Sequence, residues 1–600
     1  MSTSMKVVRR TLLGAVGFAA LGGFAPSSDN QAIAIIGATV FDATGSAPHA
    51  ANVIIRDGRI AAVGPDVRAP RGARVIRAEG KALLPGFWDV HTHWTPGGDP
   101  AMTPDVATAY VQAGVTMVND FHQPPESFEP RRRWLSQLAT PHVNLTARMS
   151  TPGGHGADWA DQNTTRWANT PEAGRAGVQA ITPYQPDLIK VFADGWRYGQ
   201  SADNTSMDEW TLKAIVDEAH KANLKVVTHT VTVERASFAA RAGVDIIVHS
   251  LQDRELDDAT VEAMKAARTA YAPTLAVYEP VKPGQAAPSD PDSPRLRQSV
   301  RKFGYALSNV KRLHDAGILI ALGTDAGMTG TPHGSSTLHE MELLVQAGLT
   351  PTEALMAGTA NSAQAMGMIA DRGTIEVGKR ADLVLVDGRP WEQISDVRKT
   401  HAVLIDGKVV HGLGVALPQA NRQPTLPPVK VGATVDDFTR PDGRTNLDTL
   451  RVEDFDGGQD RTSQISQIVT GEDGTRYLSI AARMSQKYSP TAGVIFPMAR
   501  GGIEPADLSG YRGIRLKVRG DGMPYDLRLR GLAGSWTGRF NASSEWAEIE
   551  VPFDALTPVA LRDGGQGAPF DATHIFDLRL GMVREGGSRA WLEVGSISFY

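Results

Sequence analysis

The fold is decided by the stretch Leu84-Pro85-Gly86-Phe87-Trp88-Asp89-Val90-His91-Thr92-His93. An apolar run that ends in His-x-His is typical of a strand entering a core, and side chains in a strand alternate between its two faces. His91 and His93 therefore emerge on the same side near the end of the strand. Two imidazoles on one face make either half of a metal site or an ordinary pair of histidines on a half-buried strand.

Strand-like and helical runs alternate after this stretch. The apolar runs are 116–119, 188–192, 225–229, 245–249 and 318–325. Near-continuous apolar strands separated by helices indicate a parallel sheet buried on both faces, so we predict an α/β fold, a closed (β/α)8 barrel of the TIM type, over 83–370. Thr350 with Glu353, and Ser206 with Glu209, have the spacing of helix starts.

Polar residues stand at the ends of these strands, where the active sites of barrels are built. They are Lys190, His229, His249 and Asp325. With His91 and His93 they give six polar side chains at one mouth, a pattern that favours a metal centre over isolated core histidines. Asp120 and His122 end the second strand, where we expect them to support the site rather than to bind metal.

Two β-rich segments flank the predicted barrel. Residues 30–82 hold short β-branched runs with a hairpin signal at Asp57-Gly58, and the same texture returns in 371–415. We expect these two segments to form one composite β-sandwich.

A proline-containing linker at 416–432 leads to a last domain at 433–600. Apolar and polar residues alternate there at period two, which predicts an all-β sandwich. Trp536, Phe540, Trp546 and Trp591 could offer a surface for stacking sugars or could fill the core of this sandwich.

Composition narrows the classes of function. The 600 residues carry a formal net charge of -5 and no run of basic residues, so we expect no nucleic-acid partner. The chain has no cysteine, which excludes disulfides, thiolate nucleophiles and cysteine-based zinc sites. Any metal must therefore be held mainly by His and carboxylate. Self-association is left open.

The N-terminus has the layout of a secretory signal peptide over 1–29. Lys6, Arg9 and Arg10 precede an apolar stretch at 11–24 and then small residues. We expect a periplasmic or secreted protein with no stable membrane insertion after cleavage. The Arg9-Arg10 pair suggests the twin-arginine route, and an uncleaved anchor is the alternative.

Over about 32–412 these motifs resemble the metal-dependent amidohydrolase superfamily, in particular its imidazolonepropionase-like and prolidase-like branch. The resemblance implies that His91, His93 and Asp325 bind one divalent ion and that His229 and His249 bind a second. Lys190, carboxylated by carbon dioxide, would bridge them. We expect zinc. If Lys190 instead pairs with an acidic neighbour, the site would be mononuclear.

The expected chemistry is hydrolysis. Two divalent ions that share a water lower its pKa from ~15.7 towards ~7, and the resulting hydroxide attacks the scissile carbonyl. Asp325 would act as the general acid and base, or else only as a ligand. The residues we expect to bind a small-molecule or short-peptide substrate are His155, His333 and Tyr278.

The leading prediction is cleavage of an amide or peptide-like C–N bond, as in a dipeptide or an N-acyl amino acid. The alternatives are the same site acting on a lactone, carbamate or phosphotriester, and a non-catalytic protein that binds carbohydrate or a surface. The last domain resembles the complex-I intermediate-associated, galactose-binding-like jelly rolls in Leu508-to-Ile514, Trp546-to-Phe553 and Val594-to-Tyr600. That resemblance implies a fold rather than an activity.

Overall fold

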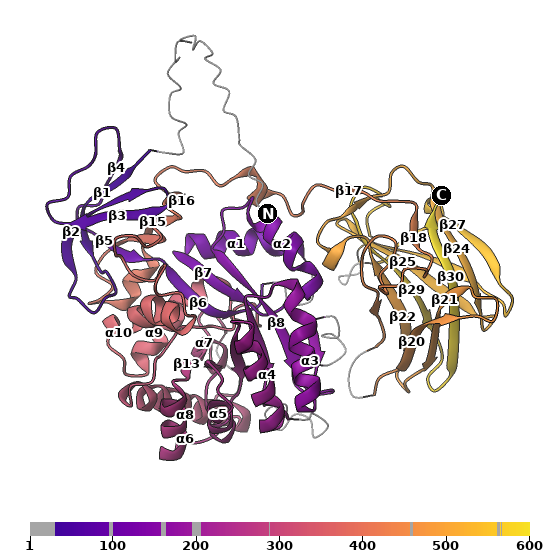
Figure 1. Cartoon of the computed structure of the whole chain (residues 1–600), viewed down its shortest axis with the longest axis horizontal. Helices are drawn as coiled ribbons and strands as arrows, with labels where there is room; N and C mark the ends of the chain where they lie inside the picture. Colours follow the sequence, from indigo (N-terminus) through magenta and orange to yellow (C-terminus); the bar gives the residue numbers. More distant parts are fainter. Residues whose placement is uncertain are drawn as a thin grey trace, which may run out of the picture.

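The computed structural model of the protein describes residues 31–94, 100–157, 164–194, 206–286, 289–456, 460–560, 565 and 567–600. The chain folds into three parts: a β-sheet subdomain, a barrel and a C-terminal β-sandwich (Figure 1). The predicted signal peptide lies outside the described residues. Within them, no helix is both long and apolar enough to cross a membrane.

A curved parallel sheet forms the barrel. Its strands, in spatial order, are β6 (Phe87–Thr92), β7 (Val115–Asp120), β8 (His142–Ser150), β10 (Leu188–Phe192), β11 (Lys225–His229), β12 (Ile246–Val248) and β13 (Ala270–Ala272), with β9 (Thr165–Trp167) beside β8. Residues 318–326 nearly close it, because Ile320 pairs with Tyr271 and Ala326 with Thr92. This eighth position makes single bridges rather than the continuous strand predicted over 318–325, and the run ends in a turn where Asp325 has a φ of 62°.

Helices cover the outside of the barrel (Figure 1). They are α1 (Thr103–Gln112), α2 (Phe128–Leu135), α3 (Pro171–Ile181), α4 (Glu209–Lys221), α5 (Val233–Arg241), α6 (Asp258–Ala267), α7 (Leu275–Tyr278), α8 (Pro294–Asp315), α9 (Ser335–Gln346), α10 (Pro351–Met356) and α11 (Ser362–Ala365). The predicted capping box of Thr350 and Glu353 starts α10. Helix α4 is capped by Asp208, which accepts a hydrogen bond from the Thr211 N–H, and not by Ser206.

The two β-rich flanks join in one eight-stranded sheet. Its order is β16 (Lys408–Gly412), β15 (Thr400–Ile405), β14 (Leu383–Asp387), β5 (Lys81–Pro85), β1 (Ile33–Val40), β2 (His49–Arg56) and β3 (Arg59–Gly64), with β4 (Arg74–Arg77) beside β1. Strand β14 runs antiparallel to β5, so the end of the domain pairs with its beginning. The Asp57-Gly58 hairpin is confirmed: both residues have positive φ between the paired Arg56 and Arg59, as a type I′ turn requires.

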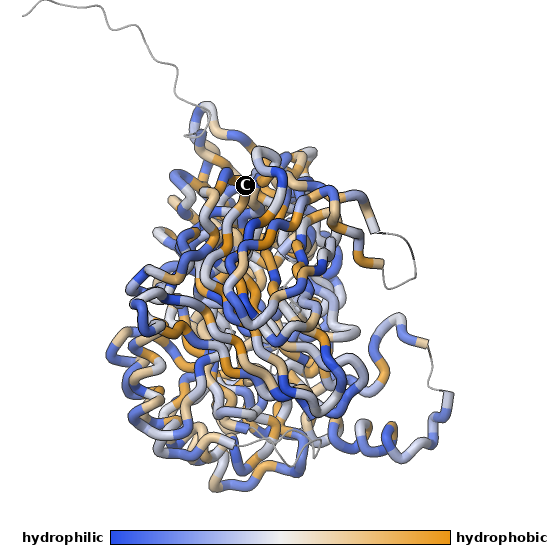
Figure 2. Tube along the Cα trace, turned by 90° about the vertical axis from the view of Figure 1, so that its right-hand side faces the viewer, coloured by the Kyte–Doolittle hydropathy of each residue, from blue (hydrophilic) through white to orange (hydrophobic). Residues whose placement is uncertain are grey.

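Two antiparallel sheets form the C-terminal sandwich. One contains β17 (Val429–Lys430), β23 (Ala506–Asp507), β29 (Ile575–Val583), β25 (Pro524–Gly531), β26 (Gly534–Asn541), β28 (Thr557–Pro558), β22 (Thr491–Pro497) and β19 (Val452–Glu453). The other contains β20 (Ser463–Thr470), β21 (Arg476–Arg483), β30 (Arg589–Phe599), β24 (Gly513–Gly520), β27 (Ala547–Pro552) and β18 (Thr434–Asp436). Hydrophobic and hydrophilic residues alternate along this domain, which faces the viewer in Figure 2. Trp536 and Phe540 belong to its buried core.

The predicted linker packs against the barrel. Within it, Asn421 in the 3-10 turn η8 (Gln419–Arg422) is buried and bonds both the N–H and the carbonyl of Ala139, at 2.8 and 3.0 Å. Its amide also donates to Thr108 of α1 at 3.2 Å. The connection between the domains is therefore anchored at a fixed point on the barrel.

Candidate metal centre

Three of the six predicted ligands converge at one end of the barrel. Every residue of β6 is buried, and the strand carries His91 to the same side as His93, as alternation predicts. His91 Nε2 lies 3.2 Å and His93 Nε2 lies 3.0 Å from Asp325 Oδ1. One ligand atom from each of the three residues falls within 4.8 Å of the others, a spacing that fits one metal ion.

Asp89, two residues before His91, builds the turn that presents Asp325. Its buried carboxylate accepts hydrogen bonds from the Thr324 N–H and hydroxyl, at 3.1 and 2.7 Å, and from the Thr337 hydroxyl at 2.8 Å. Burial raises the pKa of Asp89 to about 7. This role of Asp89 was not predicted from the sequence, although a carboxylate inside an apolar strand is an unusual feature that needs hydrogen-bond partners.

Two further imidazoles stand beside this cluster. The His229 and His249 ring centroids are 4.4 Å apart, and the His249 ring lies 4.7 Å from that of His91. His249 Nδ1 is 3.1 Å from the Thr274 hydroxyl and 4.0 Å from Asp325 Oδ2. His249 has a φ of 84°, and positive φ in residues other than glycine clusters at functional sites.

Lys190 lies among these groups on β10 with 1% of its surface exposed. In the described part of the chain its Nζ makes no hydrogen bond and no ion pair; it stands 4.9 Å from the centre of the Phe121 ring and 5.5 Å from that of Phe192. Burial, reinforced by Arg148, holds the pKa of Lys190 well below its ordinary value, although Asp325 acts in the opposite direction. A neutral amine is the form that reacts with carbon dioxide.

The donor set fits divalent metal. Burial, with the neighbouring Lys190, lowers the pKa of His91 to about 3, so its ring is neutral at pH 7. Its Nε2 faces the Asp325 carboxylate at 3.2 Å, and its Nδ1 has no hydrogen-bond partner among the described residues. Burial alone would raise the pKa of Asp325, but His249, His91 and His93 hold it well below its ordinary value. Neutral imidazoles around an ionised carboxylate are the ligands that transition metals prefer.

The predicted substrate residues divide into two groups. The His155 ring lies 4.4 Å from that of His229, tilted by 57°, and Tyr278 lies edge-on to His249 at 6.0 Å, so both border the imidazoles. His333 instead bonds the Tyr110 hydroxyl through Nδ1 at 3.0 Å, and burial, reinforced by His93, lowers its pKa to about 4. The structure therefore places His155 and Tyr278 against the His229 and His249 rings, whereas His333 lies on the His93 side, beside Tyr110.

The His155 loop depends on one glycine. A Cβ built on Gly156, which has φ 70°, would stand 2.4 Å from the Phe192 ring. The buried Arg148 donates to the Gly156 carbonyl at 3.3 Å, and the Ser150 hydroxyl donates to the His155 carbonyl at 2.7 Å. These contacts hold His155 over the imidazoles.

Comparison with known families and proteins agrees with this geometry. Residues 82–410 match the amidohydrolase family, and residues 477–594 match the family of complex I intermediate-associated protein 30. The chain is 27% identical over 356 residues to an imidazolonepropionase of Symbiobacterium thermophilum, covering 55% of this chain and 82% of that protein. It is 26% identical over 471 residues to an ochratoxinase of Aspergillus niger, covering 69% of this chain and 92% of that protein.

Solved structures share the fold of the β-sheet subdomain and the barrel. A candidate prolidase from Bifidobacterium longum superimposes with a TM-score of 0.56 at 30% identity, covering 63% of this chain and 94% of that one. A Xaa-Pro dipeptidase with bound methionine gives a TM-score of 0.56 at 22% identity, covering 64% of this chain and all of that one. The chain therefore belongs to the amidohydrolase family and is a hydrolase that acts on C–N bonds.

Proposed function

We propose that the protein is an exported binuclear metal hydrolase that cleaves the amide bond of a dipeptide or an N-acyl amino acid. The observation that carries this proposal is Lys190, a buried amine without a hydrogen bond in the described chain. Its Nζ lies between the rings of Phe121 and Phe192, which stand 4.4 Å from the His91 ring and 5.8 Å from the His229 ring. A buried amine in that position is costly unless it has a chemical use. Carboxylation would convert it into an anionic oxygen ligand.

The ligands divide between two ions. His91, His93 and Asp325 would hold the first, His229 and His249 the second, and carboxylated Lys190 would join them. Zinc suits this set of nitrogen and oxygen donors. Divalent ions bound there would acidify a water molecule and polarise the scissile carbonyl.

The side chains supply positioning and proton transfer. Asp325 is ionised at neutral pH, so its carboxylate can accept a proton from the attacking water and deliver it to the departing amine. His155 would donate a hydrogen bond to the substrate carbonyl, and the Tyr278 hydroxyl would bind the substrate at the other side of the imidazoles. The relatives named a prolidase and an ochratoxinase support a substrate in this class.

The test is metal content together with hydrolysis of a panel of dipeptides, N-acyl amino acids, lactones, carbamates and phosphotriesters. We expect about two zinc ions per chain and amide cleavage that a chelator abolishes and zinc restores. The matched control is Asp406→Asn, in the separate cluster of His142, Asp382 and Asp406, and it should keep metal and activity. If a lactone or phosphotriester is cleaved in preference to the amides, the proposed substrate class is wrong. If the chain has neither metal nor activity, the whole proposal is wrong.

Export rests on the first 29 residues. We propose that Lys6, Arg9 and Arg10 with the apolar stretch at 11–24 direct the chain to the periplasm or the medium. Fractionation of cells that make the full chain, with N-terminal sequencing of the product, checks this. Recovery of the uncleaved chain in the cytoplasm would contradict it.

A further inference from the structure

The C-terminal domain contacts the barrel at residues 125–127, in the segment that follows β7. Glu126, in the 3-10 turn η3 (Pro125–Ser127), receives Arg444 Nη2 on Oε1 at 2.6 Å and Arg444 Nη1 on Oε2 at 2.9 Å. The two side chains are only 12% and 15% exposed. A bidentate arginine–carboxylate pair shielded from water fixes the relative orientation of its two partners. Removing one partner leaves the other as a buried charge without a counter-charge, which is destabilising.

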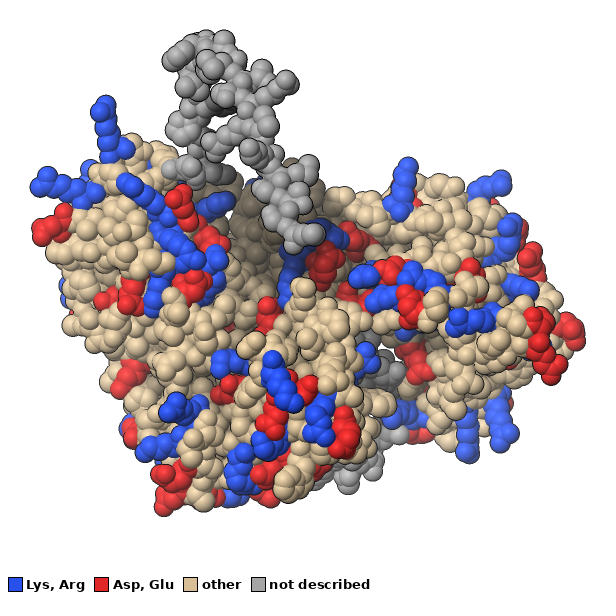
Figure 3. All heavy atoms as spheres, viewed as in Figure 1, with Lys and Arg blue, Asp and Glu red and all other residues tan. Residues whose placement is uncertain are grey.

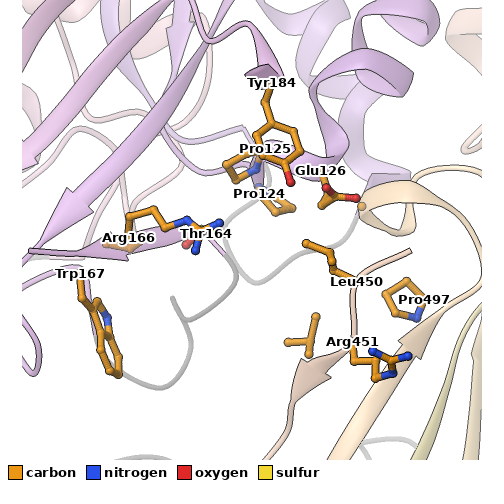
Figure 4. Close-up of a pocket in the computed structure, with 13 residues that line it drawn as sticks. Pro124, Pro125, Glu126, Thr164, Arg166, Trp167, Tyr184, Leu450, Arg451 and Pro497 are labelled. Atoms are coloured by element: carbon orange, nitrogen blue, oxygen red, sulfur yellow. The ribbon is translucent and has the colours of Figure 1, made fainter. Parts of the chain in front are cut away.

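The backbones of the two domains also meet there. A Cβ built on Gly501 of η9 (Arg500–Gly502) would stand 2.4 Å from Ser127 Cβ, and Gly501 has a φ of 62°. Beside this contact a cavity of about 520 Å³ separates Pro125 and Glu126 on the barrel from Leu450 of the C-terminal domain (Figure 4). Figure 3 shows acidic and basic side chains gathered where the barrel and the C-terminal domain meet.

A second ion pair at the interface is made by α2, which begins directly after η3. Arg133 of α2 pairs with Glu504 at 2.8 Å, and these side chains are 44% and 23% exposed. Loss of this pair removes one contact of the interface but leaves Glu126 with Arg444, and Ser127 with Gly501, in place. It therefore serves as the control.

The segment held by Arg444 is also the one that touches the metal cluster. The Phe121 ring lies 4.4 Å from that of His91, and His122 Nδ1 lies 3.2 Å from His93 Nδ1. Because His93 presents Nε2 to Asp325, binding a metal there requires the lone pair on Nε2 and the proton on Nδ1. His122 Nδ1 is then the acceptor that fixes this tautomer.

Little freedom remains between His122 and Glu126. Asp120 accepts hydrogen bonds from the His122 N–H at 3.0 Å and the Gln123 amide at 2.8 Å. Pro124 and Pro125 then restrict the backbone, and the Pro124 carbonyl accepts both the N–H and the hydroxyl of Ser127, at 2.9 and 2.7 Å. A displacement of η3 is therefore passed along the chain to His122.

We propose that the C-terminal domain is a structural part of the metal centre. Arg444, through Glu126, and Gly501, through Ser127, fix residues 120–127 so that His122 holds His93 in the tautomer that binds metal. His122, Glu126 and Arg444 are positioning residues. This inference rests on the assignment of His93 as a ligand under the proposed function.

The experiment measures zinc affinity of the full-length chain by competition with a chromophoric chelator, with zinc stoichiometry by mass spectrometry. Arg444→Met should weaken zinc binding about tenfold, the lower end of the range for residues that orient metal ligands. In a His122→Ala background the same substitution should change affinity less than twofold. Arg133→Met is the control and should leave affinity unchanged.

Two further variants keep the test decisive. Gly501→Ala leaves every charge in place and should weaken zinc binding in the same direction, which answers the question if Arg444→Met does not fold. Exchange of the pair, Glu126→Arg with Arg444→Glu, should restore part of the affinity. Unchanged affinity in Arg444→Met and Gly501→Ala overturns the inference alone, as does an equal loss in the His122→Ala background. A wild-type chain that binds no zinc defeats this inference and the proposed function together.

Discussion

Among the residues that the structure describes, two clusters of histidine and carboxylate have the spacing of a metal site, and they differ in what surrounds them. One is His91, His93 and Asp325; the other is His142, Asp382 and Asp406, where the barrel meets the β-sheet subdomain. In the second, Arg380 Nη1 lies 2.5 Å from Asp406 and Arg372 Nη1 lies 3.4 Å from Asp382. Guanidinium groups already balance its carboxylates.

The first cluster has no such balance among the described residues. Burial lowers the pKa of its His91 to about 3, and burial also disfavours the charged form of the neighbouring Lys190 amine. A cation bound there would meet an ionised carboxylate and free lone pairs, whereas a cation in the second cluster would have to displace arginine. Distance between ligand atoms is thus a weak criterion, and the charge of the surroundings decides between a metal centre and a structural ion-pair network.

The largest effect should come from the carboxylate of the first cluster. Asp325→Asn removes a ligand and the proposed acid and base, so we expect kcat/KM to fall about 10³-fold. Asp406→Asn should leave kcat/KM within a factor of two. Steady-state hydrolysis of the best amide substrate measures both. An equal loss in the two variants would remove the distinction between the clusters.

The buried amine gives the next effect. Lys190→Met should lower zinc content from two ions to one, yet leave the free energy of unfolding of the metal-free protein no lower, because methionine buries no polar group there. Lys225→Met is the matched control: it breaks an ion pair of 2.9 Å with Asp245 and should cost about 0.5 kcal/mol with zinc content unchanged. Two zinc ions retained in Lys190→Met would contradict the bridging role.

Acid should weaken the ion-pair network beside the second cluster. Burial acts to raise the pKa of Asp371. The hydrogen bonds and charges of its arginine partners outweigh burial and lower this pKa to about 2; the partners are Arg59, Arg380 and Arg372. A carboxylate with a depressed pKa stabilises the fold above its unfolded pKa, near 3.8, and loses that contribution as pH falls towards 2. Because Asp371 is partly exposed, we expect about 1 kcal/mol.

Urea unfolding of the wild type and of Asp371→Asn checks this. The two free energies should differ at pH 7 and converge as the pH falls from 4 towards 2. A difference that stays constant across that range would show that the charge of Asp371 contributes nothing.

The smallest effect should come from the histidine of the second cluster. His142 Nε2 lies 3.3 Å from Asp382, and Gln can donate to the same carboxylate. His142→Gln should therefore change the free energy of unfolding by no more than about 1 kcal/mol and leave the zinc content unaltered. Loss of zinc in this variant would mean that the second cluster also binds metal.

Much of the barrel could be predicted because its strands are strongly patterned. The runs 188–192 and 225–229 coincide with β10 and β11, and the Asp57-Gly58 turn has the geometry its residues require. Local signals failed where neighbours compete. Asp208 caps α4 in place of Ser206, and the eighth strand position is broken by the turn that presents Asp325.

The site was only partly predictable. Strand ends indicate all six proposed ligands. A carboxylate inside an apolar strand marks Asp89 as unusual, but its role cannot be predicted because its partners Thr324 and Thr337 lie far along the chain. The contact of Arg444 with Glu126 had no sequence signal at all, since a surface-type arginine on a separate domain becomes an interface residue only through the docking geometry.

The shared sheet also constrains how the chain folds. Strand β5 cannot gain its partner β14 until about three hundred further residues have been synthesised, because Leu83 pairs with Leu385. The entropy of closing so long a loop grows only logarithmically, so the pairing costs little in final stability. The cost is kinetic, because one edge of β5 stays unpaired while the barrel forms. The incomplete chain is therefore prone to aggregation. For the same reason, truncating the chain before β14 should be more damaging than any single substitution in the sheet.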